Sequence, residues 1–486
     1  SQVMRNTSFF DETRLTYDKK IDNMSNLKAT YGFRFISNYY ESDYAEVHNS
    51  GSNNNTTISA SYQYLTVDGI NNKTKSLSNY LNVDYSFDNK YFVNGVVSMD
   101  ASSRFGRETE GGIQLLGASW GVFPAVNGAW LVSSEPFMKN VDFVNFAKLR
   151  AGYGLTGNDG ISDYESMAYF SSVRWYDRAM GLVLTNLENS KIQWETTARA
   201  NVGLDLGLFN ERLNLGIDLF NSNTSDLLVL RTLPDISGLG SYWANGGEMN
   251  NKGFELSMNL KVLNLPKFKW EVGASAGHYS NKITSLPDGS YTTKVYDGEI
   301  LTAVGQPAGS FYGYKSLGVF ATEAQATAAD LKIRNLDGTF TPFEAGDIQF
   351  EEVLVDGVID ENERQVIGNP NPDLYGAFNS KFTYDRWSLN AVFTYSYGND
   401  VYNYYRSQLE SGKNFNNQTA IMNTRWTAEG QNTLQPRATY GDPMGNARFS
   451  NRWIEDGSYL RLKNVTLSYE LPVKSDYIQG VNIWAS

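Results

Sequence analysis

Residues 198–223 read ARANVGLDLGLFNERLNLGIDLFNSN, and this stretch decides the fold class. Every second position on either side of the FNER tetrapeptide is apolar, and these positions are Val202, Leu204, Leu206, Leu208, Leu213, Leu215, Ile217 and Leu219. The positions between them are small or polar, as in Asn201, Gly203 and Asp205. A period of two is the period of a β-strand, whose successive side chains point to opposite faces. The segment therefore predicts a β-hairpin with one apolar face and one polar face.

The same hairpin pattern recurs along the chain. Alternating strands flank the short turns DNK at 88–90, NLPK at 264–267 and DR at 385–386. We expect strands of about 9–11 residues, the length that crosses a bilayer when a strand is tilted. The other connections are long and rich in Gly, Asn, Asp and aromatic residues, and they fall near 101–146, 221–251, 280–377 and 398–457. Short turns on one rim and long extracellular loops on the other are typical of outer-membrane barrels.

Two architectures fit alternating strands, a soluble β-sandwich and a membrane β-barrel. A sandwich needs bulky inner faces, whereas here the face opposite the apolar one repeatedly offers Gly, Ser and Asn, which suits a wide hydrated lumen. Tyr80, Trp387 and Tyr397 lie near strand ends, where an aromatic girdle would be. We therefore predict an all-β fold, a transmembrane antiparallel up-and-down β-barrel whose leucines face lipid. A secreted soluble β-protein is the alternative.

Composition excludes several classes of function. The 486 residues include no cysteine, so neither a disulfide nor a thiolate metal site can form. A formal net charge of −12 without clusters of Lys and Arg argues against a nucleic-acid partner. The histidines, His48 and His278, are too few and too far apart for a multi-histidine metal centre. No carboxylate pair stands out as acid and base, and no Gly-rich segment lies between a strand and a helix as a phosphate loop must, so we predict no catalytic site and no enzyme.

Longer segments carry a more specific signal. They are SSRFG at 102–106, WGVFPAVNGAWLVSSEPFM at 120–138, KLRAGYGLTGN at 148–158, NKGFELSMN at 251–259, GDIQFEEVLVDGVIDENERQVIGNPNPDLYGAFN at 346–379 and RFSNRWIEDGSYLRLKNVTLSYELP at 448–472. Together, from about residue 80 to the end, they resemble the SusC/RagA-type TonB-dependent outer-membrane transporters of Bacteroidetes. The resemblance implies a multi-pass outer-membrane barrel of about 22 strands with an N-terminal plug domain. We expect residues 1–486 to be a portion of that barrel, with the plug, its TonB-coupling box and the final strands absent from this chain.

The resemblance also implies a function. Transporters of this family import oligosaccharides or peptides with energy delivered through TonB, and they pair with a SusD-like surface lipoprotein that covers the extracellular mouth. We therefore expect TonB-dependent nutrient uptake of a glycan or peptide substrate, with TonB acting through the missing N-terminal region and outer-membrane lipids around the barrel. The alternative from another class is a barrel of this family that serves as a non-transporting structural subunit of an outer-membrane surface or biogenesis complex.

The long loops carry the candidate substrate-binding and partner-binding residues. Aromatic side chains there can stack on sugar rings, pack against peptide side chains or contact a partner protein, and the candidates are Tyr242, Trp243, Tyr312, Tyr314, Tyr404, Tyr405 and Trp426. The alternative is that they pack the loops together. Arg104 and Arg150 should avoid lipid, because a lipid-facing arginine at mid-depth costs about 2–4 kcal/mol. We expect structural ion pairs for both rather than contacts with substrate.

The segment EEVLVDGVIDENE at 351–363 resembles the Asp-rich calcium-type loop of many family members. Read as an EF-hand-like loop, its candidate ligands are Glu352, Asp356, the backbone carbonyl of Val358, Asp360 and Glu363. Gly357 would allow the sharp bend, but Leu354 takes a ligand position and cannot coordinate. Two hypotheses follow: a Ca²⁺ site, with no other cofactor in the protein, or an acidic loop that is held by its own turn and by packing of Val358 and Ile359.

Overall fold

The fold comes from a computed structural model, which describes residues 1–48, 52, 54, 57–58, 64–106, 108–109, 111–175, 179–233, 236, 238–239, 241–473, 477–478 and 480–486. These residues divide into two units. Unit 1 contains Ser1–Asn210 and Phe220–Met249, and unit 2 contains Glu211–Leu219 and Asn250–Ser486. Within the described ranges, no helix is both long and apolar enough to cross a membrane.

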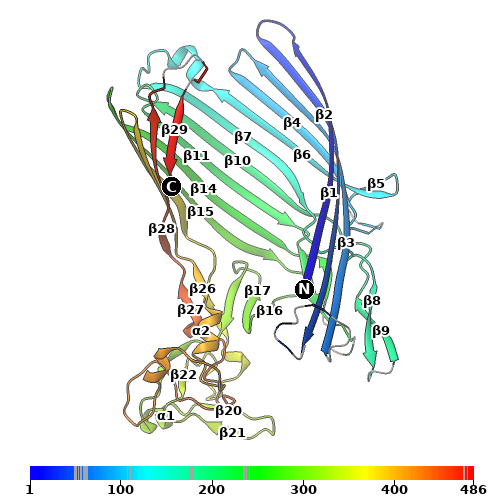
Figure 1. Ribbon diagram of the computed structural model, residues 1–486, viewed down its shortest axis with the longest axis vertical. Coiled ribbons are helices and arrows are strands. Elements are labelled where there is room, and N and C mark those ends of the chain that lie inside the picture. The colour runs from blue at the N-terminus through cyan, green and yellow to red at the C-terminus, as the bar shows by residue number, and fades with distance from the viewer. Residues whose placement is uncertain are drawn as a thin grey trace. The chain divides into compact units, whose positions relative to one another are not determined.

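Unit 1 is built on an antiparallel sheet in which strands that follow one another along the chain pair with each other (Figure 1). Its strands are β1 (Gln2–Lys20), β2 (Ser25–His48), β3 (Tyr64–Phe87), β4 (Tyr91–Ser102), β6 (Ala118–Leu131), β7 (Val144–Asn158) and β10 (Glu195–Leu208). Shorter strands pair as β5 (Ile113–Leu115) with β6, β8 (Tyr169–Trp175) with β9 (Ala179–Asn186), and β12 (Leu228–Thr232) with β13 (Ser241–Asn245). The prediction of antiparallel, up-and-down strands is confirmed in this unit.

Alternation gives this sheet an apolar face and a polar face. Across β7 and β10, Leu204 lies opposite Leu149, whereas the next pair joins Asp205 to Lys148. Val202, on the apolar face, is 51% exposed in the chain alone. Because successive side chains of a strand point to opposite faces, one register fixes all of these positions. The two faces predicted from the period of two are therefore present in β10.

Two features differ from the sequence prediction. β2 and β3 contain 24 residues each, more than the crossing length of about 9–11, because pairing continues past the part of a strand that an apolar layer covers. β6 lies inside 101–146, so the prediction of one long loop there is wrong. One face of β6 carries the large Phe123, which lies opposite the small Ser98, and the other face carries Gly128, which lies opposite Val93. Each face therefore mixes large and small residues, and the alternation is weak.

Unit 2 contains the antiparallel strand order β14-β15-β24-β25-β28-β29. These strands are β14 (Glu248–Asn264), β15 (Phe268–Ser285), β24 (Leu374–Tyr384), β25 (Trp387–Tyr397), β28 (Tyr459–Leu471) and β29 (Val481–Ala485). β11 (Leu213–Ser225) contributes residues to both units. The turn between β24 and β25 places Asp385 at φ 51°, a left-handed conformation that Asp tolerates better than most residues.

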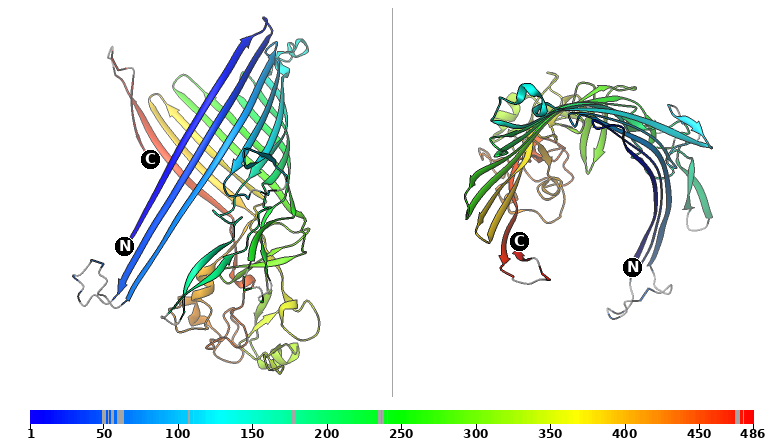
Figure 2. Two further views of the ribbon diagram at one scale, coloured as in Figure 1. Left: turned by 90° about the vertical axis from the view of Figure 1, so that its right-hand side faces the viewer. Right: turned by 90° about the horizontal axis from the view of Figure 1, so that it is seen from above.

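A loop module, defined here as residues 286–373 and 398–458, lies beyond the other end of β24 and β25 (Figure 1 and Figure 2). It contains β16 (Tyr291–Val295), β17 (Gly298–Thr302), β18 (Ser310–Gly313), β19 (Ser316–Val319), α1 (Glu323–Ala329), β20 (Lys332–Arg334), β21 (Phe340–Pro342), β22 (Ile348–Phe350), η4 (Glu361–Glu363), β23 (Gln365–Gly368), β26 (Asp400–Tyr402), α2 (Tyr404–Leu409), η5 (Ala420–Thr424), η6 (Asn451–Trp453) and β27 (Ile454–Asp456). Its buried core comprises Phe320, Ala326, Leu331, Phe343, Ile348, Phe350, Ile359 and Met444. Two of the predicted long loops therefore fold together around one core.

Candidate functional site

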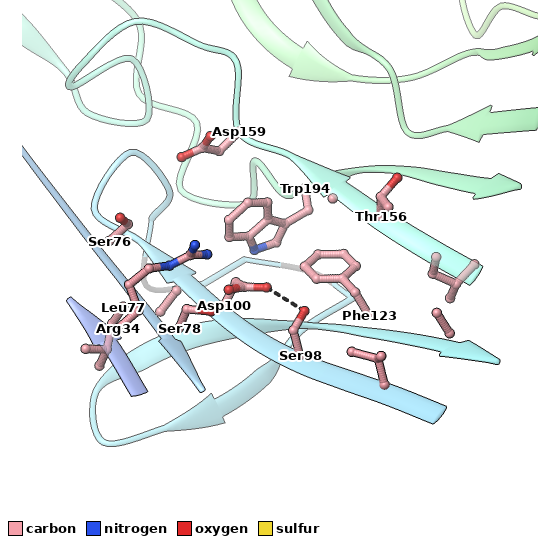
Figure 3. Close-up of a pocket in the computed structure, with 15 residues that line it drawn as sticks. Arg34, Ser76, Leu77, Ser78, Ser98, Asp100, Phe123, Thr156, Asp159 and Trp194 are labelled. Atoms are coloured by element: carbon pink, nitrogen blue, oxygen red, sulfur yellow. Dashed lines mark hydrogen bonds between the residues drawn. The ribbon is translucent and has the colours of Figure 1, made fainter. Parts of the chain in front are cut away.

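Unit 1 carries a cavity of about 530 Å³, which Figure 3 shows. Its polar lining comes from β2, β3, β4 and β7 and comprises Arg34, Ser76, Ser78, Ser98, Asp100 and Thr156. Phe123 of β6 and Trp194, which immediately precedes β10, add an aromatic wall. The close-up shows the Arg34 guanidinium, the Asp100 carboxylate and the Trp194 indole around the same space (Figure 3). Cavities of a few hundred Å³ with some polar groups and apolar walls are typical of small-molecule sites.

The aromatic wall is fixed by edge-to-face packing. The Trp194 ring lies 4.8 Å from Phe105 and 5.6 Å from Phe123, measured between ring centroids. The Nε1 atom of Trp194 is buried and has no hydrogen-bond partner among the described residues. A buried donor without an acceptor costs about 1–3 kcal/mol, so an acceptor from a ligand or an ordered water would stabilise this wall.

The polar side of the cavity offers both charges. The Ser98 hydroxyl donates a hydrogen bond of 2.8 Å to Oδ2 of Asp100. In the part of the chain that the structure describes, the Arg34 guanidinium forms no hydrogen bond or ion pair. At the rim, Asp159 accepts a 2.7 Å hydrogen bond from Ser102. A carboxylate, an uncommitted guanidinium, hydroxyls and aromatic rings can together hydrogen-bond and stack on a sugar or a peptide.

Two glycines make room for the aromatic wall. A Cβ atom at Gly157 would lie 2.1 Å from the Phe123 ring, and one at Gly121 would lie 2.9 Å from the Trp194 ring. Both distances are shorter than van der Waals contact, so any larger residue would push the rings into new positions. The close approach of β7 and β6 to these rings therefore requires residues without a side chain.

The lining of this cavity cannot be recognised in the sequence. Its lining comes from strands spread over residues 34–194, and only pairing across the sheet brings them together. The one local signal is a small polar or acidic residue at alternate positions, as in Ser76 and Ser78 or Ser98 and Asp100. Such positions indicate a polar face and do not reveal which of them line a cavity.

The two arginines singled out from the sequence form ion pairs inside unit 1. Nε and Nη2 of Arg150 donate to the two carboxylate oxygens of Asp205 at 2.8 and 2.9 Å. Nε of Arg104 lies 3.2 Å from Asp163, and its Nη1 lies 3.6 Å from Asp159. Both arginines thus have the structural pairing that the sequence analysis expects, and Arg150 lies on the polar side of β7.

Of the predicted aromatic residues, Tyr242 and Trp243 belong to unit 1 and the other five belong to unit 2. Trp243 packs against a small buried core of Phe105, Ile161 and Ile192. Among the described residues of the loop module, Tyr405 is mostly exposed, while Nε1 of Trp426 donates to the Ala321 carbonyl at 3.1 Å. Contact with a substrate or a partner stays a prediction for all seven.

The remaining three predicted aromatics make contacts within the loop module. Arg364 lies over the Tyr312 ring at 5.6 Å, and Arg448 lies over the Tyr314 ring at 4.7 Å. Burial raises the pKa of Tyr314 above its usual value. The Tyr404 ring is 5.3 Å from that of Tyr296. These contacts stabilise the module and leave little of Tyr314 for a ligand.

The acidic loop at 351–363 uses its carboxylates on its own backbone. Glu363 is buried, and its Oε2 accepts hydrogen bonds from the backbone amides of Val353 and Leu354. Three further carboxylates each accept one amide within the loop, namely Glu352 from Gly357, Asp356 from Val358 at 2.9 Å and Asp360 from Asn362 at 2.8 Å. Gly357 has φ 76°, as the sharp bend requires.

Within the residues that the structure describes, no three Asp, Glu or His side chains gather closely enough to hold a metal ion. Each of the four candidate carboxylates of the loop accepts a hydrogen bond from a backbone amide of the loop, and Ca²⁺ binding stays a prediction.

Comparison with known proteins identifies the fold. Residues 2–347 match the family model described as TonB dependent receptor-like, beta-barrel. The chain belongs to this family. The TonB-dependent receptor P3 of Formosa agariphila is 32% identical over 485 residues, which cover 96% of this chain and 46% of the relative. The TonB-dependent receptor SusC of Bacteroides thetaiotaomicron is 25% identical over 406 residues, covering 80% of this chain and 37% of the relative.

A solved structure of the RagAB peptide transporter has a fold similar to that of this chain. It matches with a TM-score of 0.77 and 23% sequence identity, over 99% of this chain and 51% of that chain. The chain spans less than half the length of the curated relatives P3 and SusC. The predicted SusC/RagA-type resemblance, the β-barrel fold and the outer-membrane location are confirmed, and these relatives are receptors and transporters rather than enzymes.

Proposed function

We propose that the full-length protein imports oligosaccharides or peptides across the outer membrane, driven through TonB. The observation that carries this proposal is the match of residues 2–347 to the barrel of TonB-dependent receptors. Relatives named SusC and a solved peptide transporter support a nutrient substrate. The chemistry of binding and gated passage needs no covalent step, in keeping with a protein that is not an enzyme.

The cavity of unit 1 is the proposed place of substrate contact. Trp194 and Phe123 supply apolar surface, and Arg34 and Asp100 supply a donor and an acceptor that can bind hydroxyl or amide groups. Arg34, Asp100 and Phe123 lie on the polar sides of their strands, which in this family face the interior of the barrel. Substrate contact there would be transient, so weak binding is sufficient.

A SusD-like surface lipoprotein is the proposed partner, and the loop module is the proposed contact surface. Phe415 and Tyr440 are 90% and 72% exposed, and their rings stack at 4.9 Å. Tyr405 is exposed on the same module. Exposed aromatic side chains of this kind are enriched at protein interfaces.

Growth of a deletion strain on single defined glycans or peptides tests the transport proposal. Complementation with the wild-type gene should restore growth on one of these nutrients, and the double variant Asp100→Ala/Trp194→Ala should restore it poorly at limiting nutrient concentration. A full-length version without its TonB-coupling box should fail to restore growth. If that uncoupled version restored growth fully, the protein would be a structural subunit and not a transporter.

For the acidic loop at 351–363 we propose a structural role that needs no Ca²⁺. Two backbone amides donate hydrogen bonds to Oε2 of Glu363, and this supports the proposal because a cation would have to compete with them for that oxygen.

A further inference from the structure

The loop module contains a second cavity, of about 460 Å³, that the sequence analysis does not indicate. Two guanidinium groups and several exposed apolar side chains line it, and the residues that matter are Leu317, Arg406, Ile421, Leu434, Asn451 and Arg452. They come from β19, α2, η5 and η6 and from the segment that follows η5, so the module must be folded to form the cavity. All of them belong to unit 2.

Among the described residues, the side chain of Arg452 donates its hydrogen bonds to neutral acceptors. Its Nη1 donates to the Asn446 carbonyl and its Nη2 to Oε1 of Gln435, both at 2.9 Å, and both acceptors are neutral. The guanidinium also stacks on Trp453 at 4.6 Å. Among the described residues no carboxylate forms an ion pair with Arg452. Burial lowers the pKa of Arg452 to about 10, the nearby Arg406 cation adds to this effect, and the charges of Glu410 and Asp442 oppose it in part.

Arg406 is oriented toward the cavity by two carboxylates behind it. Its Nε lies 2.9 Å from Glu410 and its Nη1 lies 2.9 Å from Glu455. Neither carboxylate lines the cavity, and in the described part of the chain Nη2 of Arg406 has no hydrogen-bond partner. The cavity therefore presents the Arg452 guanidinium, which has no ion-pair partner among the described residues, together with a free donor from Arg406.

The rim of the cavity is apolar. Leu434 is 78% exposed, and Leu317 and Ile421 are also exposed. None of these three side chains belongs to the buried core of the module. Their position suits a ligand with an apolar group next to an anionic one.

We propose that this cavity binds a carboxylate that carries an apolar group, as the C-terminus of a peptide with an apolar last residue does. Guanidinium donors recognise a carboxylate by charge-assisted hydrogen bonds, and the ligand would supply Arg452 with an ion-pair partner. The leucines and Ile421 would cover the apolar group. If the barrel transports as proposed above, this site indicates that the substrates are peptides. Binding of the carboxylate at this cavity does not depend on transport.

Titration of the purified full-length protein in detergent micelles tests the proposal, with fluorescence of Trp453 and its neighbours or heat of binding as the signal. The probes are N-acetyl-L-leucine and N-acetyl-L-leucinamide, which differ only in the carboxylate. We expect the acid to bind about tenfold or more tightly than the amide, a difference of about 1.4 kcal/mol, and to weaken as salt is raised. Acetate should bind more weakly than N-acetyl-L-leucine. Equal binding of the acid and the amide, or tighter binding of galacturonate, would overturn the proposal.

Two leucine variants test the proposal without substituting Arg452, because loss of the Arg452 side chain can unfold the module. Leu434→Ser should weaken binding of N-acetyl-L-leucine several-fold and leave acetate binding unchanged. Leu336→Ser is the matched control, because Leu336 is fully exposed in the same module and does not line the cavity. Unchanged binding by Leu434→Ser would contradict the proposed apolar contact. If Leu434→Ser weakens binding of N-acetyl-L-leucine while growth on peptides persists, the cavity binds the carboxylate but does not serve transport.

Discussion

At the residue scale, Asp347 joins parts of the loop module that lie 90 residues or more apart in the chain. It is fully buried, and its two oxygens accept hydrogen bonds from Nε and Nη2 of Arg437 at 2.9 Å each. Oδ1 also accepts from Nδ2 of Asn446, and Oδ2 accepts from the backbone amide of Glu344 at 3.0 Å. A buried carboxylate is stable only when its partners compensate its lost hydration, and here all of its acceptor positions are used.

Replacing Asp347 should therefore be costly. Asp347→Ala leaves a half-buried Arg437 with Glu344 alone, and removing one partner of a buried pair costs about 3–5 kcal/mol. Glu344→Ala is the matched control, because Glu344 binds the same arginine from an exposed position where an ion pair is worth about 0–1 kcal/mol. Limited proteolysis of the loop module in detergent measures the difference. Equal protease sensitivity of the two variants would contradict the assigned role of Asp347.

The cavity of unit 1 offers a second residue-scale prediction. Gly157→Ala places a methyl group into the Phe123 ring, and overpacking of this kind costs about 1–3 kcal/mol. Gly128→Ala is the control, since a Cβ atom there meets nothing within 4 Å. We expect the first substitution to lower the unfolding temperature and change the fluorescence of Trp194, and the second to change neither. Similar behaviour of both variants would show that Phe123 can move at little cost.

At the scale of the element, how much could be predicted depends on whether the signal is local. The facing of β10 follows from residues 198–208 alone, because the period of two requires no knowledge of the neighbouring strands. β6 could not be predicted, because the side chains on its two faces differ little in size and polarity. The lining of both cavities was beyond reach for a different reason: Arg34 and Trp194, or Leu317 and Arg452, meet only through strand pairing and loop packing, which no spacing in the sequence encodes.

The facing of β10 makes an element-scale prediction. Val202→Lys places a charge on the apolar face, where lipid contact at mid-depth costs about 2–4 kcal/mol. Asn201→Lys, one residue earlier, places the same charge on the polar face and serves as the control. The measurement is the intensity of the heat-modifiable band of folded full-length protein on a gel of outer-membrane fractions. This intensity should decrease for Val202→Lys and stay unchanged for Asn201→Lys. Loss of folded protein in both would argue against a lipid-facing apolar side.

The acidic loop gives a further prediction at this scale. Glu363→Ala removes the acceptor for the amides of Val353 and Leu354, and each buried group left unpaired costs about 1–3 kcal/mol. Glu361→Ala, whose side chain is mostly exposed, should have little effect. The unfolding temperature should respond to Glu363→Ala, but not to millimolar Ca²⁺ or a chelator. A rise in that temperature on adding Ca²⁺ would instead support the calcium-site hypothesis.

At the scale of the whole molecule, both units leave apolar strand faces uncovered. Leu15 of β1 and Leu460 of β28 are among the exposed apolar side chains, and a soluble protein would bury residues of this kind. Membership of an outer-membrane barrel family explains them, because lipid covers such faces. The loop module is different: its exposed aromatic residues lie on a folded unit with its own core, which has no need of lipid.

The exposed aromatic residues of the loop module are therefore expected to contact a partner protein. The stacked pair Phe415 and Tyr440 would give a SusD-like lipoprotein an apolar, rigid contact, so the double variant Phe415→Ser/Tyr440→Ser should reduce co-purification of such a lipoprotein with the full-length protein. Tyr384→Ser is the control, since Tyr384 is an exposed aromatic residue beside the short turn at 385–386, at the other end of β24. Because neither Phe415 nor Tyr440 belongs to the buried core of the module, the barrel should still fold, and its heat-modifiable band should be unchanged. Undiminished co-purification by the double variant, with the same band intact, would mean that the partner binds another surface.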